Sequence, residues 1–293
     1  MSIDLQQVAG GLAIGSVYGA IALALVLIYR STGVLNFAQG EMATFTTFIG
    51  WSLVVTVGLP YWIGFAVTVI IALLLGAGVE RIAVRPVRRA PHLTILIVTL
   101  GLFFLFNSLS LKFWGSQTKP FPSPFPEGSA HILGTYISWV SVGIFAVSLL
   151  TMALLAVLFQ LTRVGLAMRA VASNPTASAL MGINNGRMLS LGWGLSAGVG
   201  AVAGMLAANR LLLDPNMMQG VLLYAFAAAV IGGMTSPVGA VIGGLLMGVV
   251  NAVASGVSFI GSDLSTAVTF IVIVLILVLK PSGLFGRAAA VRV

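Results

Sequence analysis

The sequence predicts an all-α membrane protein, a polytopic bundle of about eight or nine transmembrane helices with Gly-rich packing. Of its 293 residues, 59% are hydrophobic and only 7% are charged. A soluble domain needs about a quarter of its residues charged to cover its surface. Uncharged stretches of the roughly 20 residues that cross a bilayer recur along the whole chain. We therefore expect residues 1–293 to form a single transmembrane domain that faces lipid.

Charged residues and turn residues divide the chain into nine expected spans. Gly58-Leu59-Pro60 breaks one long uncharged run, and Thr235-Ser236-Pro237 breaks another. The expected spans cover about 5–29, 34–57, 61–80, 92–111, part of 132–162, 188–209, two segments within 215–262, and 264–279. Whether residues 220–256 form two full spans or a re-entrant hairpin stays open at this point.

The 14 Lys and Arg residues are distributed unevenly between the loops. With this set of spans, 11 of them fall on one side, and three (Lys112, Lys119 and Arg210) fall on the other. Cytoplasmic loops carry such an excess, so we expect the N-terminus outside and the C-terminus in the cytoplasm. The first helix is expected to be retained, because no basic residue precedes its apolar run. The net charge of +8 is thus assigned to topology and not to nucleic-acid binding.

Glycine accounts for 35 residues, many of them four positions apart. In membranes this spacing lets helix backbones approach closely. The sequence therefore predicts tight helix packing where such pairs occur. The pairs are Gly11/Gly15, Gly15/Gly19, Gly194/Gly198, Gly200/Gly204, Gly239/Gly243 and Gly244/Gly248.

Several kinds of chemistry lack their residues. The chain has no cysteine, and no lysine stands in a G-x-x-x-x-G-K-[ST] loop. His92 and His131 are expected at opposite membrane faces, too far apart for a metal pair. Intramembrane catalysis and proton coupling need several buried ionisable groups, whereas Glu41 is the one acid expected inside a span. If the protein drives transport, its energy source must lie on another chain.

The cytoplasmic stretch 163–187 predicts two short amphipathic helices. Asn174 is a good N-cap for the second helix, with Pro175 at its first position. Gly182 is expected to end that helix. A loop of this length with helices of its own indicates a docking element. The alternative is a helix that lies on the lipid surface.

Glu41 stands several residues into an apolar run, in the segment 36–41 with sequence NFAQGE. A carboxylate there is costly unless it faces a cavity or a partner. Gly40 beside it permits a broken helix, as many transporters use near their pathway. The alternative is a Glu at a helix start, where the helix dipole favours it.

The pattern N-x-x-Q-G occurs twice. Residues 36–40 follow the first expected span on the inside, and residues 216–220 follow the sixth on the outside. An inverted repeat leaves the same pattern in opposite orientation. Three matching positions also arise by coincidence, and that alternative stays open.

The outside loop, about 112–135, alternates four prolines with Phe121 and Phe125. Alternating prolines favour an extended backbone. We expect either an exposed aromatic and proline rim that docks a partner, or a rigid connector.

Three segments together resemble a known family. Residues 15–42 (GSVYGAIALALVLIYRSTGVLNFAQGEM) are similar to the N-terminal signature of ABC-importer permeases for branched-chain amino acids, the LivH type. Residues 165–184 (GLAMRAVASNPTASALMGIN) resemble the cytoplasmic coupling loop of that family, and residues 232–244 (GGMTSPVGAVIGG) resemble its late glycine-rich turn. The similarity runs from about Gly11 to Phe285.

The resemblance implies the permease subunit of a binding-protein-dependent importer in the bacterial inner (cytoplasmic) membrane. Two ABC ATPase subunits would dock on residues 163–185, and a second, LivM-like permease would complete the pore. A periplasmic binding protein would deliver solute to loops 112–136 and 210–217. This chain would hold no cofactor, because the ATPases would bind the ATP. Urea, short amides or aromatic acids are the alternative solutes, and a passive channel, an ion-coupled carrier and a membrane enzyme are the alternative classes.

The candidate site residues form two sets, with no catalytic residue and no metal ligand among them. The set expected to couple to the ATPases is Arg163, Arg169, Asn174, Pro175, Ala177, Leu180, Met181 and Gly182. The set expected along the translocation pathway is Asn36, Gln39, Gly40, Glu41, Asn216 and Gln219.

Overall fold

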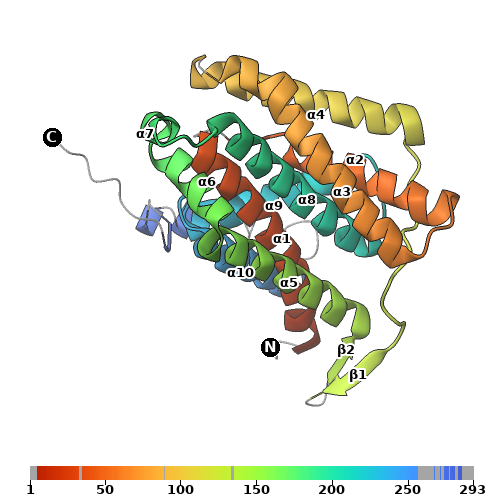
Figure 1. The fold of residues 1–293 in the computed structure, drawn as a ribbon. Coiled ribbons are helices and arrows are strands. Elements are labelled where there is room, and N and C mark those ends of the chain that lie inside the picture. The colour runs from red at the N-terminus through yellow and green to blue at the C-terminus, as the bar shows by residue number, and fades with distance from the viewer. Residues whose placement is uncertain are drawn as a thin grey trace. The chain divides into compact units, whose positions relative to one another are not determined.

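A computed structural model describes residues 5–32, 35–88, 90–132 and 135–256, together with positions 267, 271, 274–276, 278–280 and 283–285. It confirms an all-α membrane fold (Figure 1). The helices are α1 (Leu5–Thr32), α2 (Gln39–Trp51), α3 (Tyr61–Val79), α4 (His92–Trp114), α5 (Trp139–Leu161), α6 (Arg163–Ser173), α7 (Pro175–Leu180), α8 (Asn185–Leu211), α9 (Met217–Gly232) and α10 (Pro237–Gly256).

Within the described residues, six helical segments are long and apolar enough to cross a membrane. They are Gln6–Arg30, Tyr61–Val87, Leu93–Trp114, Trp139–Leu161, Asn185–Leu211 and Pro237–Gly256. The predicted break at 235–237 is confirmed, since α9 ends at Gly232 and α10 begins at Pro237. The last expected span, about 264–279, lies mostly outside the described residues. The total of eight or nine spans therefore stays a prediction.

The contacts group the chain into two compact units, and the expected single domain stays a prediction. Unit 1 comprises Met1–Val26, Phe125–Leu149 and Leu223–Val293. Its glycines confirm the predicted tight helix packing and show that α1 packs against α10. A Cβ atom on Gly15 would lie only 2.9 Å from the carbonyl oxygen of Gly244. Unit 1 also holds a short antiparallel hairpin, β1 (Ser129–Ile132) and β2 (Thr135–Ser138), which the sequence analysis did not predict.

Unit 2 comprises Leu27–Pro124 and Leu150–Leu222. Its most extensive helix pair is α3 with α8. The two backbones lie close, because a Cβ atom on Gly194 of α8 would stand 2.7 Å from the carbonyl oxygen of Leu73 in α3. Helix α8 also packs against α2, where a Cβ atom on Gly200 would meet the side chains of Gln39 and Ala43. Helix α8 therefore packs against α2, which carries Glu41, and against α3, which precedes Glu80.

Two details of unit 2 correct the sequence analysis. Helix α2 begins at Gln39 and not near residue 34, because the Asn36 side chain and carbonyl hold the preceding backbone in a turn. Phe121 is buried against Tyr61, with ring centroids 6.1 Å apart, so the expected exposed rim is wrong at this residue. The indole nitrogen of Trp51 donates to the Pro120 carbonyl over 3.0 Å and fixes this part of the loop.

Candidate functional site

The first N-x-x-Q-G segment forms the turn that starts α2. The Ala38 N–H donates to Asn36 Oδ1 over 3.1 Å, and the Gln39 N–H donates to the Asn36 carbonyl over 3.3 Å. Asparagine stabilises such turns by bonding the backbone two residues on. Its amide nitrogen also donates to Gln39 Oε1 over 3.3 Å. The turn therefore fixes the Gln39 side chain as well as the helix start.

Gln39 joins the start of α2 to the middle of α8. Its Nε2 donates to the Ser196 carbonyl over 2.9 Å, and the Ser196 hydroxyl donates back to Gln39 Oε1 over 2.9 Å. Both residues are fully buried. Reciprocal bonds of this kind satisfy both buried groups and set the position of α2 against α8.

Glu41 is also fully buried and lies in the first turn of α2, as in the helix-start alternative. Its two carboxylate oxygens accept from Asn107 Nδ2 and from Gln219 Nε2, each over 3.1 Å. Asn107 and Gln219 also donate to Asn216 Oδ1, over 3.0 and 2.9 Å. We call Glu41, Asn107, Asn216 and Gln219 the Glu41 cluster. Among the described residues no cation pairs with this carboxylate, and its hydrogen-bond donors are neutral amides.

The second N-x-x-Q-G segment repeats the turn of the first. The Gln219 N–H donates to the Asn216 carbonyl over 3.0 Å, as Gln39 does to Asn36. The two segments also contact each other, which was not predicted from the sequence, while their placement on opposite sides of the membrane stays a prediction. The chain turns back after α8 at Leu212, whose φ is 65°. Residues 216–219 thereby reach α2, where a Cβ atom on Gly40 would lie 3.2 Å from the Met218 carbonyl oxygen.

The six expected pathway residues thus lie in one region of unit 2. Gln39 is two positions before Glu41, and Glu41 bonds directly to Gln219. The sequence analysis missed Asn107 and Ser196. Each is a single polar residue in an apolar helix, and only the fold shows which partner it meets. A polar residue in a membrane helix is the signal that could have found them.

The stretch 163–187 forms the two expected helices, α6 and α7. Thr162 caps α6 by accepting from the Gly165 N–H, and Asn174 caps α7 by accepting from the Ala177 N–H over 3.0 Å. Gly182 follows α7 with a φ of 81°, as expected of a helix stop. The predicted cap at Asn174 and the predicted stop at Gly182 are therefore confirmed.

The side chains expected to couple to the ATPases are mostly exposed on α6 and α7. Leu180 is 85% exposed and Met181 is 82% exposed. Arg163, Arg169 and Ala177 are exposed as well. Two apolar side chains so open to solvent form a surface that a partner or a lipid can cover.

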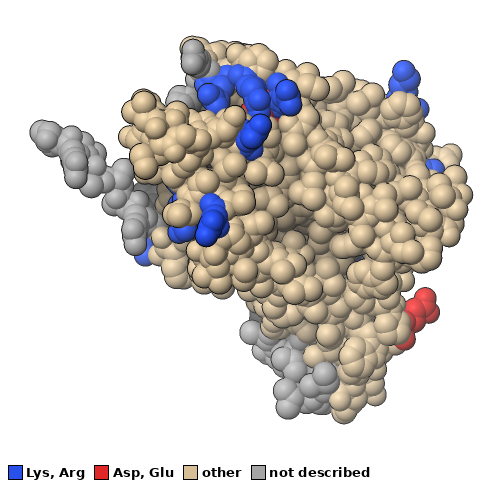
Figure 2. All heavy atoms as spheres, viewed as in Figure 1, with Lys and Arg blue, Asp and Glu red and all other residues tan. Residues whose placement is uncertain are grey.

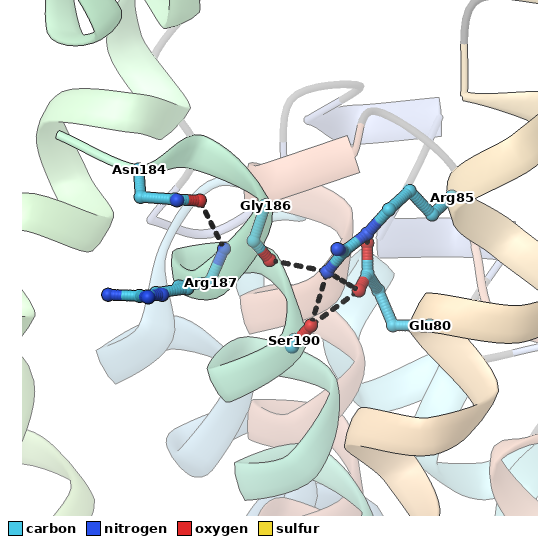
Figure 3. Close-up of polar contacts among 6 residues, drawn as sticks. All are labelled: Glu80, Arg85, Asn184, Gly186, Arg187 and Ser190. Atoms are coloured by element: carbon cyan, nitrogen blue, oxygen red, sulfur yellow. Dashed lines mark hydrogen bonds and ion pairs between the residues drawn. The ribbon is translucent and has the colours of Figure 1, made fainter.

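A second buried acid corrects the expectation that Glu41 stands alone. Glu80 follows α3 in a π-helical turn (Glu80–Val84) and is 1% exposed. Arg85 binds both of its oxygens, through Nε over 3.2 Å and through Nη2 over 2.6 Å (Figure 3). An arginine five residues after the acid was the sequence signal for this pair. That the two side chains form an ion pair is shown by their positions in the structure.

The fold and the surface together define the class of protein. The face in Figure 2 is covered mainly by uncharged side chains, with Lys and Arg gathered in a few groups. Six described helical segments can cross a membrane, and polar side chains meet inside the bundle. The protein is a multi-pass α-helical membrane protein with an internal polar cluster.

Comparison with known proteins identifies the family. Residues 7–279 match the family described as branched-chain amino acid transport system, permease component. The chain is 33% identical to the high-affinity branched-chain amino acid transport permease LivH of Salmonella typhimurium, over 99% of this chain and 97% of that protein. It is also 33% identical to the permease BraD of Pseudomonas aeruginosa, over 99% and 98% of the two chains. The chain belongs to this family of permeases.

Two further similarities are more limited. A xylose/arabinose import permease, XylH of Sulfolobus acidocaldarius, is 34% identical over 147 residues, which is 49% of this chain and 39% of that protein. The solved structure of PsaBC from Streptococcus pneumoniae in complex with Fab matches with a TM-score of 0.51 and 13% identity, over 95% of this chain and 92% of that chain. The second similarity concerns the fold alone.

Proposed function

We propose that the chain is the membrane-spanning subunit of a binding-protein-dependent ABC importer that carries branched-chain amino acids into the cytoplasm. Two partner ATPases bind and hydrolyse ATP, a second permease completes the pore, and a periplasmic binding protein delivers the solute. The chain itself binds no cofactor. Support comes from the full-length similarity to LivH and BraD, whereas the sugar permease covers about half of the chain.

The observation that carries the choice of solute is the Glu41 carboxylate. It is fully buried, and within the described part of the chain its hydrogen-bond donors are neutral amides. An amino acid in transit brings an α-ammonium group, which a buried carboxylate attracts strongly at low dielectric. Urea and short amides bring no such charge. We therefore assign the pathway to the side of α2 that holds the Glu41 cluster, with an amino acid as the solute.

Docking of the ATPases is proposed at α7. Leu180 and Met181 are the most exposed apolar side chains there, and an apolar contact with a groove on the ATPase would bury them. Substitution of either residue by Asp places a carboxylate in that contact, at a cost of several kcal/mol. ATP-driven uptake of labelled leucine by proteoliposomes with all partner subunits should then be lost.

The matched control is Gln117→Asp, an exposed position on the loop after α4. It should leave assembly with the ATPases unchanged, because the position lies outside α6 and α7. Normal assembly and uptake with both Leu180→Asp and Met181→Asp would instead favour a lipid-surface role for α7. No ATP-driven leucine uptake by the wild-type complex would remove the proposed function itself.

The proposed orientation places α6 and α7 in the cytoplasm and residues 115–128 outside, in the inner membrane. The chain has no cysteine, so single cysteines report on it directly. Thr176 and Gln117 are suitable positions because both are exposed, whereas Ser178 is buried and bonded to Asn185. An impermeant thiol reagent added to intact spheroplasts should label Gln117→Cys and not Thr176→Cys. Equal labelling of both variants would contradict this orientation.

A further inference from the structure

Four groups at the cytoplasmic end of unit 2 form a closed set of bonds, which we call the Glu80 latch. Glu80 and Arg85 follow α3, and Gly186 and Ser190 lie in the first turns of α8 (Figure 3). Arg85 Nη2 donates to the Gly186 carbonyl over 2.9 Å and to Ser190 Oγ over 2.7 Å. The Ser190 hydroxyl donates in turn to Glu80 Oε2 over 2.6 Å. The latch therefore ties the end of α3 to the start of α8.

The chemistry of the latch makes it specific for these side chains. The planar guanidinium binds the carboxylate through two nitrogens, and the second hydrogen of Nη2 is shared between the Gly186 carbonyl and Ser190 Oγ. A lysine has one compact charge and cannot keep this geometry. The acid sits in a π-helical turn, a feature that is rare and frequent at functional sites.

The start of α8 is also bonded to α7. Asn185 Nδ2 donates to the Pro175 carbonyl over 2.7 Å, and the Ser178 hydroxyl donates to Asn185 Oδ1 over 3.1 Å. Asn185 is next in sequence to Gly186, which the latch holds. The short helix that exposes Leu180 and Met181 is thereby connected to α3 through one turn of α8.

From this end, α8 runs without a break to the buried Gln39, which lies two residues before Glu41. It is one helix from Asn185 to Leu211, and its Ser196 bonds Gln39 in both directions. Along the way its backbone lies close to α3, at Gly194 and at Gly76. Interdigitated close packing of this kind transmits displacement and does not absorb it.

We propose that the Glu80 latch locks α3, α7 and α8 into one lever, which carries the movement of α7 to Gln39 and the Glu41 cluster. The inference rests on the proposed importer function. Glu80, Arg85 and Ser190 are positioning residues in it, since they contact neither solute nor ATP. Without the latch, α7 still moves with the ATPases, but α3 and α8 no longer move together as one rigid body.

The test measures uptake and ATP hydrolysis separately in proteoliposomes that hold the complete importer. The variants are Glu80→Gln, Arg85→Lys and Ser190→Ala, and the control is Arg88→Lys, an exposed arginine outside the latch. The complexes should assemble and hydrolyse ATP, while the amount of solute taken up per ATP falls by about fivefold or more, the lower end of coupling between sites. The ratio for Arg88→Lys should equal that of the wild type.

A purely structural role gives a different result. Assembly, hydrolysis and uptake then fall in parallel, and an unchanged ratio in all three variants overturns the inference. Ser190→Ala keeps the ion pair and is the mildest change. If the Glu80→Gln complex fails to assemble, the amount of solute taken up per ATP by Ser190→Ala tests the inference instead. A wild-type complex that hydrolyses ATP but takes up no branched-chain amino acid would overturn the proposed function, and this inference with it. A working wild type with unaffected variants would overturn only the latch.

Discussion

Unit 2 buries two carboxylates, and their partners differ in kind. Glu80 is held by the guanidinium of Arg85 and the hydroxyl of Ser190. Glu41 is held by the side-chain amides of Asn107 and Gln219. The first site contains its own counter-charge, whereas the second has hydrogen bonds but no cation among the described residues. Burying an unbalanced charge is costly, so the two sites differ in what they can still bind.

This difference distinguishes a structural acid, which already has its cation, from a receptive acid, by which we mean one that can still bind a cation. A carboxylate with a bidentate arginine is saturated, and a further cation gains little there. A carboxylate with only neutral donors has no counter-charge, so a cation that comes close to it at low dielectric is attracted strongly. The Glu80 site therefore fits a fixed connection between helices. The Glu41 site fits the passage of a positively charged group.

The comparison predicts its largest effect for loss of the arginine. Arg85→Ala leaves Glu80 buried with one hydroxyl as partner, and we expect a loss of about 3 kcal/mol in stability. Glu80→Ala should cost less, about 1 kcal/mol, because Arg85 is 35% exposed and keeps the Gly186 carbonyl and water as partners. Thermal unfolding of both variants in one detergent measures the difference. Equal losses of stability would show that an unpaired Glu80 is no more costly to the fold than an unpaired Arg85.

The second prediction removes the charge of the receptive acid. Glu41→Gln keeps the shape of the side chain, and its one carbonyl oxygen can still accept one of the two amide hydrogen bonds, while its NH2 group replaces the other acceptor. The side-chain amide that loses its acceptor has to turn, but the fold should be retained. Leucine uptake should fall by about tenfold or more, since a hydrogen bond to a charged group is worth about 1.5–3 kcal/mol. Uptake is measured per amount of permease in the membrane. Asn107→Asp, which adds a second acid beside Glu41, serves as the opposite change and should destabilise the fold. Normal uptake by Glu41→Gln would remove Glu41 from the pathway.

Local features of the fold could be predicted from the sequence because they depend on neighbouring residues. The cap at Asn174, the stop at Gly182 and the break before Pro237 each follow from the backbone preferences of one or two residues. The Gly-rich contacts were predicted as packing surfaces, although their partners were not. Helix spacing shows which face of a helix is used but not which helix lies against it.

The long-range contacts of the candidate site could not be predicted in this way. Glu41 meets Gln219, which is 178 positions away in sequence, and Ser190 meets Glu80 over 110 positions. Both contacts depend on how α8 and the turn at Leu212 place distant segments. The sequence pattern identified the two N-x-x-Q-G segments but not their contact, because counting spans assumes that each helix crosses the whole bilayer. Helix α9 has 16 residues and rises about 24 Å, short of a core of about 30 Å.

The smallest predicted effect concerns Thr44, one turn after Gly40 in the same helix. Its hydroxyl is fully buried and has no hydrogen-bond partner among the described residues. Side chains on a helix lean back toward its N-terminus, so this hydroxyl lies on the side of Glu41. An unpartnered buried hydroxyl costs about 1 kcal/mol, and Thr44→Val should leave stability unchanged or raise it by about that amount.

Thr47→Val is the matched control, because the Thr47 hydroxyl donates to the Ala43 carbonyl over 2.7 Å. That variant should lose about 1 kcal/mol, so the two substitutions should shift thermal unfolding in opposite directions or by clearly different amounts. A transport measurement then shows whether the Thr44 hydroxyl bonds the solute or affects stability alone. If its hydroxyl bonds the solute as the solute passes Glu41, leucine uptake by Thr44→Val falls although the protein is no less stable. Unchanged uptake together with raised stability would confine the receptive site to the Glu41 cluster, and a loss of stability would show that Thr44 has a partner within the fold.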